Sequence, residues 1–390
     1  MDPLALMDEY QPRFSRNSLN ILMLATLGLI VLFNLPQLMA QRDHAVLPKP
    51  APLNLNTWRT DSGAEVWFAP YIGAESVHIE LWYTAGSQFS RHGETLLLTE
   101  LLAAQAKRQK LPIRVRSDQD FIQIRTQFSR QPTVLKKQIE ALKSLIYFPA
   151  LSANDIEQVR TSYLPAASDE LRSQLYGKDH QYSTSVTLDS LGALTRADIQ
   201  KFHHKHLHPN RLHVALVADL PANAARVLLE RLLPVSPHAP SIKQTAQSLA
   251  QSHARSENLV LLNWPPLQDH QMDIDMAVSA AILKSHYGDL VNWYPGLSNS
   301  LFQLQSKPDQ RFEDLDAKSM LTTKRQLALK WIRQTHAADS LSRYLIHLNA
   351  YGLPQDYMHK QIERLQEFDR GRWQQVLNTL LAPVVMADNS

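Results

Sequence analysis

A run of 25 residues without a charged side chain lies near the start of the chain, between Arg16 and Arg42. Within it, residues 21–33 read ILMLATLGLIVLF and are almost wholly apolar. A helix of this length extends about 37 Å, which exceeds the roughly 30 Å of a bilayer's hydrocarbon core. Residues 17–41 are therefore predicted to form a transmembrane signal anchor. A signal peptide cleaved after Ala40 is the alternative.

The charges that flank this run predict its orientation. Arg13 and Arg16 precede it, whereas Arg42 on the other side is followed by Asp43. Positive residues favour the cytoplasmic side of a membrane. We therefore expect a single-pass protein of the inner (cytoplasmic) membrane, with the bulk of the chain in the periplasm if the source is a Gram-negative bacterium.

The composition of the chain excludes several classes of function. Its 390 residues include 40 Lys plus Arg and 37 Asp plus Glu, and this near balance argues against a nucleic-acid partner. The absence of cysteine excludes disulfides, thiolate metal sites and a cysteine nucleophile. No GxGxxG or GK[ST] loop occurs among the 11 glycines, so the common nucleotide-binding loops are absent. No cofactor is predicted.

Hydrophobic periodicity indicates a mixed α+β sandwich in residues 53–235. Alternating apolar residues favour strands, and apolar residues at 3.6 spacing favour amphipathic helices. Ser152 and Thr195 each precede an acidic residue by three positions, which is typical of a helix start. Strands are expected as a hairpin over 56–68, at 76–83, inside 114–129 and at 211–218, and helices at 94–107, 132–147, from 152, from 195 to 206 and at 221–233.

The remainder of the chain predicts a shorter second unit. One strand is expected at 258–263, followed by helices at 273–286, 316–334, 340–351, 355–366 and 371–381, with an irregular stretch at 294–309. The predicted organisation is a tail at 1–16, the anchor at 17–41, a proline-containing linker at 42–52, a first domain at 53–235, a linker at 236–256 and a second domain at 257–390.

Three segments together resemble the insulinase/pitrilysin (inverzincin) family of zinc peptidases. Residues 57–68 read TWRTDSGAEVWF, and residues 77–94 read VHIELWYTAGSQFSRHGE. Residues 175–220 match the family's sequence pattern in each of four successive segments, which form a turn, a helix, a second turn and a strand. Residues 351–368 resemble its C-terminal domain. The resemblance implies two tandem α/β sandwich domains of one shared fold, similar to the mitochondrial processing peptidase, the second shortened here.

The resemblance also locates the family's metal site, and this chain departs from it there. In the family, an H-x-x-E-H helix supplies two zinc ligands and a general base, because histidines four residues apart share one helix face. With Gly93 setting the register, these positions fall on Leu96, Thr99 and Glu100. The third ligand, a glutamate on a later helix, aligns with Ala166. A degenerate member without zinc or catalytic residues is therefore expected.

Two other clusters of polar residues are weaker candidates for a site. Residues 203–208 hold four histidines, of which only His204 and His208 have i, i+4 spacing, so a solvated helix end is expected there. Residues 269–275 hold three aspartates but lack the glycine and closing glutamate of a calcium loop. No metal is predicted at either cluster.

The resemblance implies a non-catalytic homologue of zinc peptidases, which is a pseudo-peptidase rather than an enzyme, and the apolar run at 17–41 predicts that it is anchored in the membrane. Its expected role is to pair with, position or regulate a catalytic relative or a membrane complex. The expected partners are thus the membrane, through residues 17–41, and another protein. A stand-alone peptide-binding or scaffold module is the alternative, and an active enzyme with a relocated site is a third hypothesis.

Overall fold

A computed structural model describes residues 46–90, 92–163, 168–177, 180, 182–183, 186–234, 253–256, 259–264, 270–287, 291–305 and 317–381, together with Met23. Among these residues, no helix combines the length and the apolar character that a membrane crossing requires. The predicted anchor at 17–41 lies outside them except for Met23, so it stays a prediction.

Residues 56–218 contain a six-stranded sheet in the order β1-β2-β6-β3-β5-β4, in which only β2 and β6 are parallel. The predicted hairpin and the strand at 76–83 are present. The strand expected inside 114–129 is present as β5, and a further strand, β4, was missed. Asp118 separates the two, because it accepts the backbone N–H groups of Asp120 and Phe121 and closes a turn. The strands are β1 (Asn56–Arg59), β2 (Glu65–Pro70), β3 (Ser76–Tyr83), β4 (Ile113–Ser117), β5 (Ile122–Ser129) and β6 (Leu212–Ala218).

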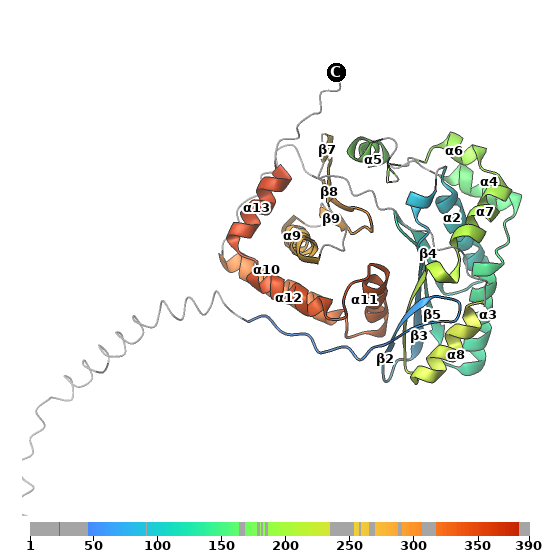
Figure 1. Cartoon of the computed structure of the whole chain (residues 1–390), viewed down its shortest axis with the longest axis horizontal. Helices are drawn as coiled ribbons and strands as arrows, with labels where there is room; N and C mark the ends of the chain where they lie inside the picture. The colour runs from blue at the N-terminus through green and yellow to red at the C-terminus, as the bar shows by residue number, and fades with distance from the viewer. Residues whose placement is uncertain are drawn as a thin grey trace, which may run out of the picture.

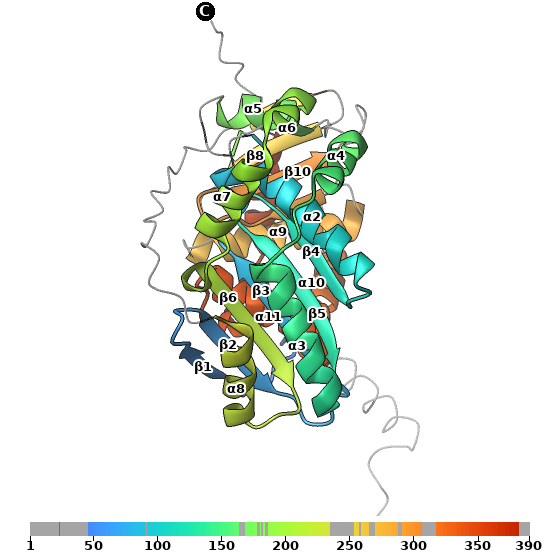
Figure 2. The same ribbon diagram turned by 90° about the vertical axis from the view of Figure 1, so that its right-hand side faces the viewer.

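Helices cover one face of this sheet, as Figure 2 shows for α2, α3 and α8. The N-caps predicted at Ser152 and Thr195 are confirmed, since each side chain accepts the backbone N–H three residues later. The two short helices α5 and α6 were not predicted. The helices of this half are α2 (Glu94–Arg108), α3 (Pro132–Tyr147), α4 (Ala153–Ser162), α5 (Ser168–Tyr176), α6 (Leu188–Ala193), α7 (Arg196–His206) and α8 (Ala222–Leu232), with 3-10 turns η2 (Ser87–Phe89) and η3 (Pro209–Arg211).

A second, four-stranded sheet has the order β7-β8-β10-β9 and is antiparallel throughout. Two expectations fail here. Residues 294–309, expected to be irregular, include β10, and the polar linker expected through residue 256 ends in β7, because both short runs gain ladder partners from β8. The elements are β7 (His253–Ser256), β8 (Leu259–Trp264), α9 (His270–Tyr287), β9 (Val291–Tyr294), β10 (Ser300–Gln305), α10 (Ala317–Arg333), α11 (Ala338–Ala350), α12 (Tyr357–Glu367) and α13 (Arg370–Leu381).

The second sheet repeats part of the topology of the first. The chain order β8-α9-β9-β10 matches β3-α2-β4-β5, and the strands lie side by side as 8-10-9 and 3-5-4. In both sheets the added neighbour, β7 or β6, is antiparallel to the first strand of the set. The fold is therefore mixed α+β with a recurring strand-helix-strand-strand unit.

The second half of the chain packs on the free face of the first sheet. Helix α11 lies against β2, β3 and β6, on the opposite side from α3 and α8 (Figure 1). One apolar core lies under the helices α2, α3 and α8, and a second joins Ala215 and Val217 of β6 to Leu345 and Leu348 of α11. Because both faces are covered, the polar residues of β3 and β5 that face α11 lie between the two halves.

Candidate functional site

A cavity of about 530 Å³ lies at the N-terminal end of α2, where the resemblance places the family's metal site. Ser90, Gly93 and Leu96 line it from α2 and the approach to it. Residues 117–120, from the end of β4 and the turn that follows it, form a second wall, and Tyr351, directly after α11, belongs to a third. The cavity is therefore built from both halves of the chain.

Of the residues predicted at the metal-site positions, three lie in the described part of the chain, and only Leu96 among these three lines the cavity. Thr99 is 3% exposed, and its hydroxyl donates to the carbonyl oxygen of Thr95 at 2.7 Å, so it is held by its own helix. Glu100 is exposed to solvent, and Ala166 lies outside the described residues. Nowhere in the described part of the chain do three His, Cys, Asp or Glu side chains gather closely enough to hold a metal ion.

The register of α2 is set at its first turn. Gly93 has φ +101°, a left-handed conformation that suits glycine, and an added Cβ would lie 2.7 Å from Leu191 Cδ2. The Ser90 hydroxyl donates to Glu94 Oε2 at 2.7 Å and accepts the N–H of Gly93 at 3.1 Å. These contacts fix which helix positions face the cavity, and so they place an apolar side chain at Leu96.

Asp120 is the polar centre of the cavity wall, and it joins four segments of the chain. Its Oδ1 accepts from Gln88 Nε2 and from the Tyr182 hydroxyl, both at 2.6 Å, and its Oδ2 accepts the N–H of Leu297 at 2.8 Å. The Tyr182 oxygen in turn accepts the N–H of Ser298 at 3.0 Å. Asp120 is only 1% exposed. Its carboxyl group therefore connects the two halves of the chain and accepts three hydrogen bonds from the protein.

Burial raises the pKa of Asp120 to about 7, the charge of Asp118 adds to the rise, and the hydrogen bonds from Tyr182 and Leu297 oppose it. A raised pKa is frequent at catalytic carboxyl groups. Here the same carboxyl group is enclosed by donors from the protein, so we interpret it as a structural group.

A larger cavity, of about 800 Å³, lies between the polar face of the first sheet and the second half of the chain. Four arginines, three tryptophans and two tyrosines contribute to its lining. These residues are Arg114, Arg116, Arg125, Arg343, Trp82, Trp293, Trp331, Tyr344 and Tyr357. The sequence analysis missed this site because its walls come from strands and helices more than 150 positions apart. The alternating arginines of IRVRS were the available signal.

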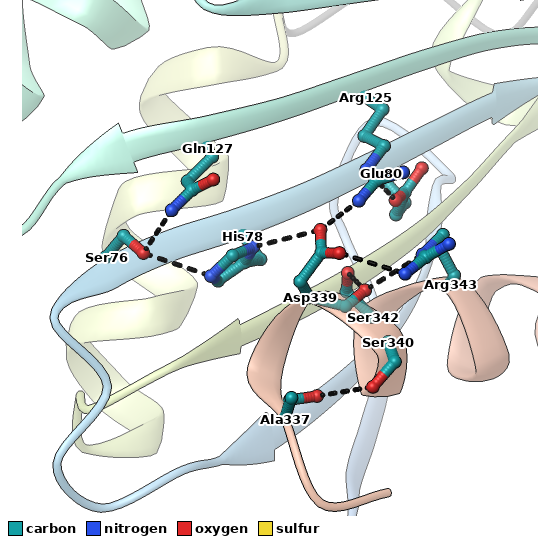
Figure 3. A network of polar contacts seen from close by, with 10 residues as sticks. All are labelled: Ser76, His78, Glu80, Arg125, Gln127, Ala337, Asp339, Ser340, Ser342 and Arg343. Carbon is teal, nitrogen blue, oxygen red and sulfur yellow. Dashed lines mark hydrogen bonds and ion pairs between the residues drawn. The ribbon is translucent and has the colours of Figure 1, made fainter. Parts of the chain in front are cut away.

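Asp339 at the start of α11 organises an ion-pair network beside this cavity (Figure 3). It pairs with Arg125 of β5 and with Arg343 Nη2 at 2.9 Å, and Arg125 Nε lies 3.3 Å from Glu80 Oε1. Burial raises the pKa of Glu80 to about 7, against the opposing effect of Arg125. The network ties α11 to β3 and β5, and it largely offsets the charges of Arg125 and Arg343.

The same network includes a serine and a histidine but lacks the geometry of a hydrolytic triad. The Ser76 hydroxyl lies 3.0 Å from His78 Nε2, and Gln127 Nε2 donates to the same hydroxyl. His78 Nδ1 is 3.7 Å from Asp339 Oδ1, which exceeds hydrogen-bond distance. Because Asp339 is engaged by two guanidinium groups, it does not orient His78 as a triad carboxylate would.

The histidine cluster at 203–208 is only partly the solvated helix end that was expected. His203 Nε2 lies 2.6 Å from the carbonyl oxygen of Ile146, and burial lowers the pKa of His203. His206 is 3% exposed, and its ring stacks on Phe202 with centroids 4.4 Å apart. Burial, then the charge of Arg211, lowers the pKa of His206 to about 3. These two histidines face the core because α7 packs against α2, whereas His204 is exposed.

The chain was compared with protein-family models and with curated protein sequences. Residues 193–283 match the family model described as the peptidase M16 inactive domain. A comparison with curated protein sequences gave no match.

Several solved structures share the fold. The M16 inactive domain from Pseudomonas fluorescens superposes with a TM-score of 0.67 at 18% identity, covering 84% of this chain and 95% of that one. A protease from Helicobacter pylori gives a TM-score of 0.61 at 14% identity, covering 84% and 96%. The first half of the periplasmic protease PqqL from Escherichia coli gives 0.60 at 12% identity, covering 86% and 91%. The resemblance to the insulinase/pitrilysin (M16) peptidases predicted from the sequence is therefore confirmed, with the inactive domain as the part that matches.

Proposed function

We propose that this chain is a non-catalytic, membrane-anchored homologue of the M16 peptidases, which pairs with a catalytic relative or a membrane complex and positions or regulates it. The observation that carries the proposal is the wall of the α2 cavity. Leu96, at the position of the family's first zinc ligand, lines this cavity. The hydroxyl of Thr99, at the position of the general base, donates to the carbonyl oxygen of Thr95 in the same helix. Neither side chain can hold zinc or act as a base at neutral pH.

The chain retains the family's fold, although Leu96 and Thr99 stand at the positions of a zinc ligand and the general base. The core under α2, α3 and α8 is continuous, and the Asp120 contacts hold the second half against the first. A chain that retains the fold of a peptidase without the residues for catalysis is expected of a subunit that binds another protein.

The similarity to full-length PqqL supports pairing. It covers 86% of this chain but 47% of that protein, so there a unit of this kind is joined to about as much protein again. We propose that this chain likewise binds a second unit of comparable kind. Anchoring through residues 17–41 would hold the two at the membrane at high effective concentration.

The stand-alone peptide-binding module stays as a second candidate function. The cavity of about 800 Å³ favours it, since aromatic and arginine side chains are the residues that most often anchor a bound peptide.

We expect the purified full chain to contain no stoichiometric zinc. A zinc site needs about three or four protein ligands, and of the predicted positions only Glu100 carries a side chain that could bind zinc. Elemental analysis of the detergent-purified chain is the measurement, with an M16 peptidase that has an intact H-x-x-E-H motif prepared alongside as the loading control. About one zinc per chain would overturn the proposal.

A further inference from the structure

We propose that the cavity of about 800 Å³ between the two halves binds an extended, acidic peptide segment. The inference rests on the second candidate function, for which it names the class of peptide, and it does not depend on the proposed pairing, because the cavity is complete within one chain.

The charge of the cavity wall is the first step. Arg125 and Arg343 are offset in part by Glu80 and Asp339. Arg114 and Arg116 also line the cavity, are exposed, and form no ion pair with any residue that the structure describes. The cavity therefore carries an excess of positive charge on two guanidinium groups that are available to a ligand.

The two arginines lie close to further positive charge, which Glu80 and Asp339 offset only in part. Arg114 stands directly opposite Arg125 in the β4–β5 pair, and like charges in that relation repel. Arg116 is two positions further along the same face of β4. A ligand with negative charge would relieve the repulsion, since guanidinium groups bind carboxylates through paired hydrogen bonds.

The spacing of the two arginines indicates the shape of the ligand. Residues two apart on a strand are separated by about 6.6 Å, which is also the distance between alternate side chains of an extended peptide. An acidic residue at every second position would meet Arg114 and Arg116 in turn. The side chains between them would contact the aromatic residues of the cavity, among them Trp293 and Trp331.

The test uses the full chain in a mild non-ionic detergent and a short fluorescein-labelled peptide in which glutamate alternates with serine. A matched peptide with glutamine in place of glutamate is the ligand control. We expect saturable binding of the acidic peptide by fluorescence anisotropy, with quenching of tryptophan fluorescence, and at least about tenfold weaker binding of the glutamine peptide.

Two double variants locate the binding. R114Q/R116Q is expected to weaken the acidic peptide at least about tenfold, whereas K136Q/K137Q, which removes the same charge from exposed positions on α3, is expected to change it less than about twofold. Equal losses in the two variants would show non-specific attraction and overturn the proposal. Equal binding of the acidic and glutamine peptides would also overturn the proposal. A third peptide carries phosphoserine in place of glutamate, and binding of that peptide alone would overturn the proposal as well.

Discussion

Replacement of Asn349 by leucine is expected to lower the free energy of unfolding by about 3 kcal/mol. Asn349 lies on α11 and is 2% exposed. Its Nδ2 donates to the carbonyl oxygens of Glu65 and Val214, each at 3.1 Å, and its Oδ1 lies 3.1 Å from His213 Nδ1. One side chain thus ties the second half to two neighbouring strands of the first sheet, and leucine would leave buried polar groups without partners.

Urea unfolding of the full chain in a mild non-ionic detergent measures this loss. S340A is the matched control, because the Ser340 hydroxyl lies on the same helix and, among the residues that the structure describes, donates only to the carbonyl oxygen of Ala337 (Figure 3). We expect S340A to cost less than about 0.5 kcal/mol. If N349L costs no more than S340A, the hydrogen bonds of Asn349 do not help to hold α11 against the sheet.

Replacement of Asp120 by alanine is expected to cost about 3 kcal/mol at pH 5, because three donors from three segments lose their acceptor. The loss should be about 2 kcal/mol smaller at pH 8. The ordinary pKa of aspartate is 3.8 and burial raises that of Asp120 to about 7, so between these values the folded protein holds a proton that the unfolded chain has released. The contribution of Asp120 to stability therefore declines as the pH rises through this range.

Unfolding free energies of the wild type, D120A and D120N at pH 5 and pH 8 test this expectation. D120N keeps the shape and stays neutral, so it should lie between the other two at pH 5. A loss in D120A that grows from pH 5 to pH 8 would contradict the account, since it would show that the three donors outweigh burial and hold the pKa of Asp120 below its usual range.

Local patterns predicted most of the secondary structure. The helix at 132–147 has the predicted bounds, and the caps at Ser152 and Thr195 form as expected, because capping depends on residues three positions apart. The strands at 291–294 and 300–305 were missed because neither is long enough to show a clear period. Their pairing with each other, and that of β10 with β8, stabilises them instead.

The candidate sites could be predicted only in part. The register from Gly93 led to Leu96, which does line the smaller cavity. Asp120, by contrast, was not singled out from the sequence, because its partners Tyr182 and Leu297 lie 62 and 177 positions away. The larger cavity depends on the packing of α11 against β3, which no local pattern in the sequence indicates.

Cross-linking in native membranes tests the central claim most directly. The full chain, with residues 17–41 in place, is tagged at its C-terminus, cross-linked and purified, and the bound chains are identified and quantified. The proposed function predicts one partner at comparable abundance, either a peptidase relative with an intact H-x-x-E-H motif or a subunit of a membrane complex. Recovery of this chain alone would contradict pairing.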